Sequence, residues 1–259
     1  MSHNLAAVGL LTCAENPRLV NRRQRDATFY YSLLSTAQLY STASYQAHNL
    51  RGIGLHGNYP GINLAGQNLT GAHFGNGAEL SQANLSQANL TSAVISAGLA
   101  EANFRGAEIR GAAITSISIA QLYSTASYQA RDLTEIDLNG NSLSGANFAS
   151  QNLTRASFYG ATLTNANFHL ANLSNASFTY PFGQFPPFGV SPTDLVGANL
   201  SHANLTRARF GGEEECQGEF CWFFEGANLS GANLTGADAT WILPLRQDDQ
   251  HGYPEHDSA

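Results

Sequence analysis

Three cysteines and eight histidines are the side chains of this sequence best suited to metal binding or nucleophilic catalysis. Cys216 and Cys221 lie five positions apart, which fits a local disulfide in an oxidising compartment or two free thiols in a reducing one. No histidine lies near them in the sequence, whereas structural zinc requires four ligands. The histidines are scattered, and no nucleophile, base and carboxylate form a recognisable set. We therefore expect no metal, no cofactor and no enzymatic activity.

Two segments, residues 179–194 and 211–226, concentrate aromatic side chains, and the second also carries five glutamates. Their aromatic residues are Tyr180, Phe182, Phe185, Phe188, Phe220, Trp222, Phe223 and Phe224. Exposed aromatic clusters are usually buried against something. Either the two segments pack on each other and on the rest of the protein, or they bind a partner protein or a flat sugar face stacked on Trp222.

The net charge of −7 is unevenly distributed. Residues 50–210 contain seven acidic residues and seven arginines, so this part is neutral. The acidic excess lies in residues 213–225 and in the tail after Asp238. Apart from four arginines between positions 18 and 25, no basic surface for nucleic acid is indicated, and no apolar run is long enough to span a membrane.

A large apolar residue recurs at every fifth position through most of the chain. Between positions 133 and 178 the series is unbroken: Leu133, Leu138, Leu143, Phe148, Leu153, Phe158, Leu163, Phe168, Leu173 and Phe178. Alanine usually lies two positions earlier with Asn, Ser or Thr between, as in Ala83-Asn84-Leu85. Neither a helix of period 3.6 nor a strand of period 2 keeps such residues on one side. Each repeat must therefore bury Ala and Leu in a short extended segment and then turn.

The length of one coil follows from irregularities in this period. The period slips after Leu55, Phe74 and Ile95, which are four repeats apart. A corner that tolerates an extra or missing residue should recur once per coil, so four repeats, roughly 20 residues, should form one square coil. The alternation of Phe and Leu after Phe148 then predicts stacked Phe on two opposite faces.

The Ala-Asn-Leu pattern resembles the pentapeptide-repeat family over about residues 50–119, 128–178, 195–210 and 227–239. The resemblance implies an all-β fold, a right-handed quadrilateral β-helix (a solenoid) with four repeats per coil. It also implies a bacterial protein with a structural or protein-binding role. Members that protect DNA gyrase mimic DNA with an acidic rod, which the neutral body of this chain does not match.

The decapeptide QLYSTASYQA occurs twice, at residues 38–47 and 121–130. Each copy follows a capping-box pattern, Ser35 with Gln38 and Ser118 with Gln121. We expect short helical segments near 36–44 and 119–127; the alternative keeps the tyrosines of each copy as ordinary inward positions of the repeat.

These patterns divide the chain into four parts. Residues 1–34 form a partly flexible N-terminal segment, 35–119 a first repeat module, 120–240 a second module with loops 179–194 and 211–226, and 241–259 a polar tail. The two loops add 12 and 14 residues to the normal spacing on either side of four repeats, which is one coil. Both loops should therefore leave the same corner.

The sequence favours a non-enzymatic scaffold or protein-interaction module whose specificity lies in the two aromatic loops. A DNA-mimicking gyrase-binding protein and a carbohydrate or cell-surface binding module are the alternatives. The protein partner is unknown, and a homodimer would supply a cap for one solenoid end. Cys13 ends a short apolar stretch without a preceding positive charge, so a signal peptide is not convincing and a cytoplasmic location is favoured.

Overall fold

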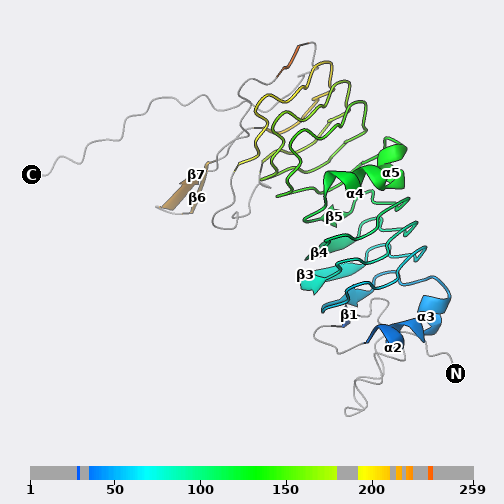
Figure 1. The fold of residues 1–259 in the computed structure, drawn as a ribbon. Helices are drawn as coiled ribbons and strands as arrows, with labels where there is room; N and C mark the ends of the chain where they lie inside the picture. Colours follow the sequence, from blue (N-terminus) through cyan, green and yellow to red (C-terminus); the bar gives the residue numbers. More distant parts are fainter. Residues whose placement is uncertain are drawn as a thin grey trace, which may run out of the picture.

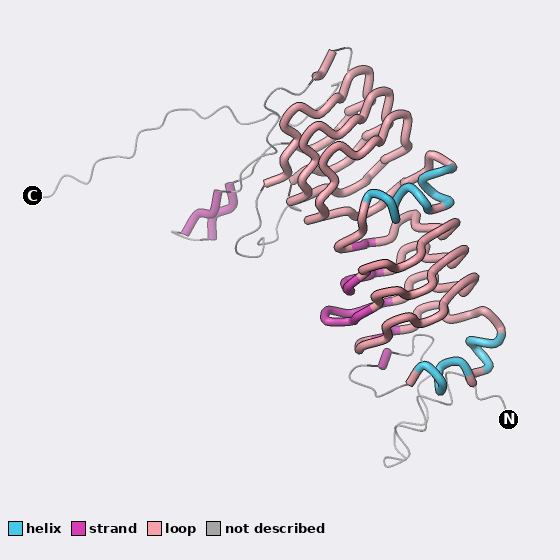
Figure 2. Tube along the Cα trace, viewed as in Figure 1, coloured by secondary structure: helices cyan, strands magenta, loops and turns pink. Residues whose placement is uncertain are grey.

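The computed structural model describes residues 28–29, 35–179, 192–210, 214–217, 220–223 and 233–235. Apart from residues 214–217 and 220–223, the described chain winds into a stack of coils that forms one elongated rod (Figure 1). Most of each coil consists of turns and isolated bridges, with few regular strands and four short helices (Figure 2). None of the described helices is long and apolar enough to cross a membrane.

Each coil pairs in parallel with the next through the central residue of every repeat. Asn152 pairs with Asn172, 20 positions later, and Asn147 pairs with Asn167 in the same way. In the first part of the rod the offset is 19 or 21, as between Asn63 and Asn84. Four repeats therefore make one coil, as the slips in the period predicted.

The most regular strands form a five-stranded parallel sheet along one side of the rod, in the order β1-β2-β3-β4-β5. Its strands are β1 (Thr28–Phe29), β2 (Gly54–Leu55), β3 (His73–Glu79), β4 (Val94–Gly98) and β5 (Ala113–Ile114). A separate antiparallel pair comprises β6 (Glu214–Gln217) and β7 (Phe220–Phe223).

The core consists of columns of large side chains, one column for each side of the square. The column that runs under the sheet, called the corner column below, contains Leu55, Phe74, Ile95, Ile114, Leu138, Phe158, Phe178 and Phe210. All eight are at most 1% exposed. At about 25 cal/mol per Å² of apolar surface, such columns are the main stabilising contribution to the fold.

Phenylalanines stack along two opposite sides of the core, as predicted. Phe158 and Phe178 stack in the corner column with ring centroids 5.2 Å apart, and Phe148 and Phe168 stack at 5.0 Å on the opposite side. Rings from the two sides meet edge to face across the core, with Phe158 and Phe168 at 5.8 Å. Both arrangements are favourable for aromatic quadrupoles.

Four short helices replace part of a coil at two places, on the side of the rod opposite the sheet (Figure 1). They are α2 (Thr36–Tyr40), α3 (Ala43–Gln46), α4 (Ile119–Ser124) and α5 (Ala126–Gln129). Ser35 and Ser118 form the expected capping boxes with Gln38 and Gln121. The helical segments expected near 36–44 and 119–127 are therefore confirmed.

A buried threonine separates the two helices of each pair. Thr42 donates its hydroxyl to Leu39 O at 2.7 Å, and the same hydroxyl accepts from Tyr45 N at 3.1 Å. Thr125 makes the equivalent bonds in the second copy. One side chain thus ends the first helix and caps the second, which explains why a ten-residue segment holds two helices.

A tyrosine pair closes the strand edge that each helix pair leaves open. Asn63 lacks a strand neighbour on the helix side, but its N–H donates to the Tyr40 hydroxyl at 2.7 Å and its carbonyl accepts from Tyr45 at 2.8 Å. Tyr123 and Tyr128 do the same for Asn147. These four tyrosine hydroxyls thus complete the backbone hydrogen bonds of the joint at positions open to solvent.

We expect Leu153→Ala to lower the free energy of unfolding by about 2–5 kcal/mol, because it leaves a cavity in a dry column. Leu153 is fully buried, whereas Leu170, in the adjoining coil, is 55% exposed. Leu170→Ala is therefore the matched control and should change stability by less than about 0.5 kcal/mol. Urea unfolding of both variants is the measurement, and equal losses would contradict the buried-column fold.

Candidate functional site

The one-residue changes in repeat length and both long loops occur directly after the corner column. After Leu55 and Ile95, three residues precede the next large residue of the repeat, and after Phe74 five do, in place of the usual four. The helix pair α4–α5 also lengthens its coil, since the bridge from Ala113 to Asp137 spans 24 positions, but its helices lie on the opposite side of the rod. We call the segment that follows the corner column in each coil the insertion corner.

Both aromatic loops leave this corner from consecutive coils. Ser177 pairs with Arg209, and the rings of Phe178 and Phe210 stack at 4.5 Å with an interplanar angle of 8°. The bridge from Thr162 to Asp194 spans 32 positions, so the first loop adds 12 residues to the coil. The loop origins thus lie one above the other, which agrees with the sequence-based expectation.

The described residues contain only part of the predicted binding surface. Tyr180, Phe182, Phe185, Phe188 and Phe224 lie outside them. Phe220, Trp222 and Phe223 belong to β7, where Trp222 is the register partner of Glu215 and Phe223 that of Glu214. An aromatic strand is therefore paired with an acidic one. Contact between the two loops stays a prediction.

Cys216 and Cys221 are register partners in the β6–β7 hairpin. Directly opposed residues of antiparallel strands have Cα atoms about 4.5–5.5 Å apart, within the range that a disulfide spans. The backbone pairing is therefore compatible with the predicted disulfide, while the alternative of two free thiols depends on the redox conditions.

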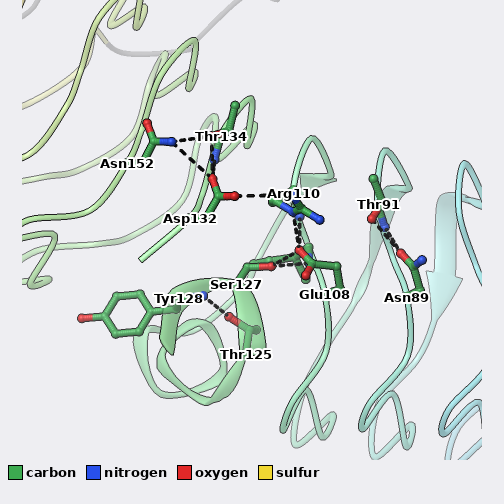
Figure 3. Close-up of polar contacts among 11 residues, drawn as sticks. Asn89, Thr91, Glu108, Arg110, Thr125, Ser127, Tyr128, Asp132, Thr134 and Asn152 are labelled. Atoms are coloured by element: carbon green, nitrogen blue, oxygen red, sulfur yellow. Dashed lines mark hydrogen bonds and ion pairs between the residues drawn. The ribbon is translucent and has the colours of Figure 1, made fainter. Parts of the chain in front are cut away.

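A polar cluster at the junction of the two modules went unrecognised in the sequence (Figure 3). Arg110 donates through Nε to Glu108 at 3.0 Å and through Nη1 to Asp132 at 3.4 Å. Ser127, in α5, donates to the same Glu108 oxygen at 2.5 Å and accepts from Ile109 N. Arg110 therefore links the coil before the helix pair to the coil after it.

The cluster holds its carboxylates in the charged form. Burial alone would raise the pKa of Glu108, but hydrogen bonds from Ser127 and Arg110 outweigh it and lower that pKa. The hydrogen bond from Thr134, together with Arg110, lowers the pKa of Asp132. Both acids are partly exposed, so the ion pairs are screened and contribute modestly to stability. One arginine thus bridges two carboxylates across the helix pair, and this cluster serves as a structural link.

On the same side of the rod, asparagine and threonine side chains form a hydrogen-bonded ladder. Thr154 donates to Asn152 Oδ1 at 2.7 Å, and Asn172 of the next coil donates to Thr154 Oγ1 at 3.0 Å. Asn89 and Thr91 show the same bond in the first module (Figure 3). Because these groups satisfy one another, the ladder offers few free donors or acceptors for a ligand.

Two histidine pairs are brought together by the coil geometry. His56 and His73 have ring centroids 5.1 Å apart, and His169 and His202 lie 5.6 Å apart. Burial and His73 lower the pKa of His56. Within the described ranges, no group of three or more metal-ligating side chains accompanies them. The members of these pairs are 17 and 33 positions apart, so the 20-residue period alone does not pair them in the sequence.

Asp137 is a largely buried carboxylate at the corner column. It accepts a hydrogen bond from Asn139 N at 3.0 Å. Burial raises its pKa, although that hydrogen bond opposes the shift. Asn, Ser or Thr is usual at this central position of the repeat, so a carboxylate here carries a desolvation cost.

Comparison with known proteins identifies the repeat. The family description "Pentapeptide repeats" matches in eight copies, over residues 61–96, 76–112, 132–169, 142–179, 193–212 and 223–241. None of the curated proteins compared matches the chain.

Several solved structures resemble the chain. HetL, a pentapeptide repeat protein involved in heterocyst differentiation regulation in the cyanobacterium Nostoc, is 26% identical over 76% of this chain and 90% of its own, with a TM-score of 0.27. A thylakoid-lumen pentapeptide repeat protein of Arabidopsis thaliana is 32% identical over 43% and 66%, with a TM-score of 0.23. QnrB1, a plasmid-mediated fluoroquinolone resistance protein, is 16% identical over 68% and 79%, with a TM-score of 0.20. Because these TM-scores are all below 0.5, the likenesses bear on no functional conclusion.

We expect Asp137→Asn to raise the melting temperature by about 2 °C at pH 7.5, because the amide keeps the acceptor for Asn139 and removes a desolvated charge. The raised pKa means that the folded state holds the proton more tightly than the unfolded state. The destabilising contribution is therefore present above the folded pKa and disappears below the unfolded pKa. Melting curves from pH 3.5 to 7.5 should converge for the two proteins at the acid end, and a constant difference would contradict this explanation.

We expect Cys216 and Cys221 to form a disulfide when the purified protein is oxidised. Of the three cysteines in the chain, one thiol should then remain available to iodoacetamide in the denatured protein, as counted by mass spectrometry. Cys216→Ser should leave two, Cys13 and Cys221. Three reactive thiols after oxidation of the wild-type chain would show that the pair does not bond.

Proposed function

The chain belongs to the pentapeptide-repeat family and folds as a right-handed quadrilateral β-helix, and on that premise we propose that it is a non-enzymatic scaffold that binds a partner protein at its insertion corner. The observation that carries this proposal is that the one-residue changes in repeat length and both long loops share one corner. Repeats elsewhere are uniform and internally hydrogen-bonded, so they supply stiffness rather than specificity. Loops are where binding residues usually lie when a rigid scaffold positions them.

The composition of the corner supports a protein partner. The loops concentrate eight aromatic residues, and aromatic side chains are enriched at the centres of protein interfaces. In the β6–β7 hairpin, the strand containing Trp222 is paired with the strand containing Glu214 and Glu215. An apolar anchor with acidic neighbours suits a partner surface that has an apolar pocket rimmed by basic side chains.

The charge of the rod argues against the DNA-mimic alternative. Residues 50–210 carry equal numbers of acids and arginines. Arg110 forms ion pairs with Glu108 and Asp132, and Arg155 Nη1 is 2.7 Å from Glu135 Oε1. A protein that imitates DNA needs a continuous negative surface, since a duplex carries one charge per about 1.7 Å of its axis. Inhibition of gyrase supercoiling by the purified chain would reverse this judgement.

Carbohydrate binding is the second candidate, because Trp222 provides a flat aromatic face. A glycan-array screen with wild-type protein and Trp222→Ala separates it from protein binding. Retention of a glycan by the wild type alone would favour the sugar.

Two deletions test the proposed function without changing the coil. Removal of residues 180–191 places Leu195 five positions after Phe178, and removal of 211–224 places Leu229 five positions after Phe210. We expect both variants to keep the melting temperature within about 5 °C of the wild type, because the repeat register is restored. Proteins cross-linked by the wild-type chain in its native extract should be lost from both variants.

The matched control changes the polar ladder, with Asn172→Ala in the repeat that precedes the corner column. It should retain the same cross-linked proteins. A partner that survives both loop deletions, or that is lost equally in Asn172→Ala, would place binding elsewhere on the rod. Loss of stability in the deletions with retained binding would assign the loops a packing role only.

A further inference from the structure

The internal duplication allows one helix pair to be compared with an identical one in a different setting. Residues 38–47 and 121–130 have the same sequence, the same caps and the same tyrosine bonds to the coil that follows. The helix pair α4–α5, however, lies between two coils. The pair α2–α3 precedes the first complete coil of the described residues.

The second copy shows what the other face of the helix pair is built to bind. Gln121 Nε2 donates to Leu99 O at 2.7 Å and to Ala102 O at 3.0 Å. In addition, Gly106 N donates to Ser124 O, and Ala126 N donates to Ala107 O, each at 2.8 Å. These bonds join α4–α5 to the coil formed by residues 99–112.

The equivalent face of α2–α3 presents the same groups. Gln38 and Ser41 correspond to Gln121 and Ser124, and Ala43 corresponds to Ala126. Gln38 and Ser41 are exposed, whereas Gln121 and Ser124 are half-buried. The difference arises from the coil beneath α4–α5, because the two segments are otherwise alike.

β1 shows that the rod continues beyond α2. Thr28 and Phe29 pair in parallel with Gly54 and Leu55, so the backbone of β1 adds one more strand to the sheet on its N-terminal side. Ala27-Thr28-Phe29 also follows the Ala-x-Phe pattern of the repeat. In the second copy the supporting coil, residues 99–112, leads directly into β5 at Ala113 and Ile114. By the same register, residues 14–27 lead directly into β1.

We propose that residues 14–27 form the supporting coil of α2–α3 and dock on the face that contains Gln38, Ser41 and Ala43. Placed on this register, Leu19 takes the position of Phe104 and Ala27 that of Ala112. Asn21 and Asp26 take the positions of Gly106 and Gly111.

Those two glycines have φ of 71° and 64°. Asn and Asp are the non-glycine residues that tolerate positive φ best, so the turn chemistry of the proposed coil is consistent.

The proposed coil is weaker than its counterpart. Gln24 takes the position of the buried Ile109, so this coil buries less apolar surface. We expect it to open before the rest of the rod, in the way that terminal units of solenoids do.

Hydrogen exchange of the full chain tests the proposal, with α4–α5 as the internal control. Leu19→Asp should speed amide exchange in peptides spanning α2–α3 by about tenfold or more, because it places a charge in the supporting coil. Peptides spanning α4–α5 should be unchanged, which also shows that the variant is folded. Asn4→Asp, at a position before the proposed coil, is the matched charge control and should leave both helix pairs unchanged.

The same samples test whether a second copy of the chain, and not residues 14–27, covers this face of α2–α3. Light scattering should give the mass of a monomer, 27.6 kDa, for wild type and variant. A dimer whose α2–α3 peptides are protected in a concentration-dependent way, and equally in Leu19→Asp, would overturn the proposal and assign this face to another copy. Unprotected α2–α3 peptides in the monomeric wild type would show that residues 14–27 do not dock.

Discussion

The structure depends on the pairing of each coil's backbone with the coils before and after it. At each repeat the N–H of the large residue donates forward, as from Leu153 to Asn172 O, and the N–H of the central residue donates backward, as from Asn152 to Arg131 O. These bonds stay parallel and regular only if successive coils have equal length. An inserted segment must therefore leave the stack between two such hydrogen bonds. Otherwise it must supply other groups that replace the hydrogen bonds it removes. The loops leave at the insertion corner, and the helix pairs bring substitutes in Tyr40 with Tyr45, and Tyr123 with Tyr128.

Much of the fold could be predicted because a five-residue period has few physical solutions. The unbroken series from Leu133 to Phe178 required a turn in every repeat, and the slips after Leu55, Phe74 and Ile95 identified the square coil and its tolerant corner. The capping boxes at Ser35 and Ser118 located the helices, since a serine with a glutamine three residues later is a local signal. The role of the tyrosines was not predicted, because it depends on a strand edge formed 18–24 residues away in the sequence.

The candidate site was predicted less completely, for an equally physical reason. The loop residues Tyr180 to Phe188 have no period, so nothing in the sequence fixes which of them meet. Only their points of departure follow from the repeat, and the stacked rings of Phe178 and Phe210 agree with that expectation. The link between Glu108, Arg110 and Asp132 escaped notice because the helix pair changes the coil offset to 24 at that step. Charges that look scattered in the sequence are there brought into one cluster.

Because the helix pair accepts a coil on either side, the rod can be lengthened by tandem duplication. The two copies of QLYSTASYQA are separated by 83 residues, a length that contains one helix pair and the coils up to the next. A gene segment of that length, copied in tandem, would add a module whose first helix pair already matches the last coil of the one before. No new interface would have to arise, because Gln121, Ser124 and Ala126 show that the joint accepts a coil on its N-terminal side as well as on its C-terminal side. The rod is thus built from a unit that recombination can multiply or remove, and relatives of this chain should differ in length by whole modules.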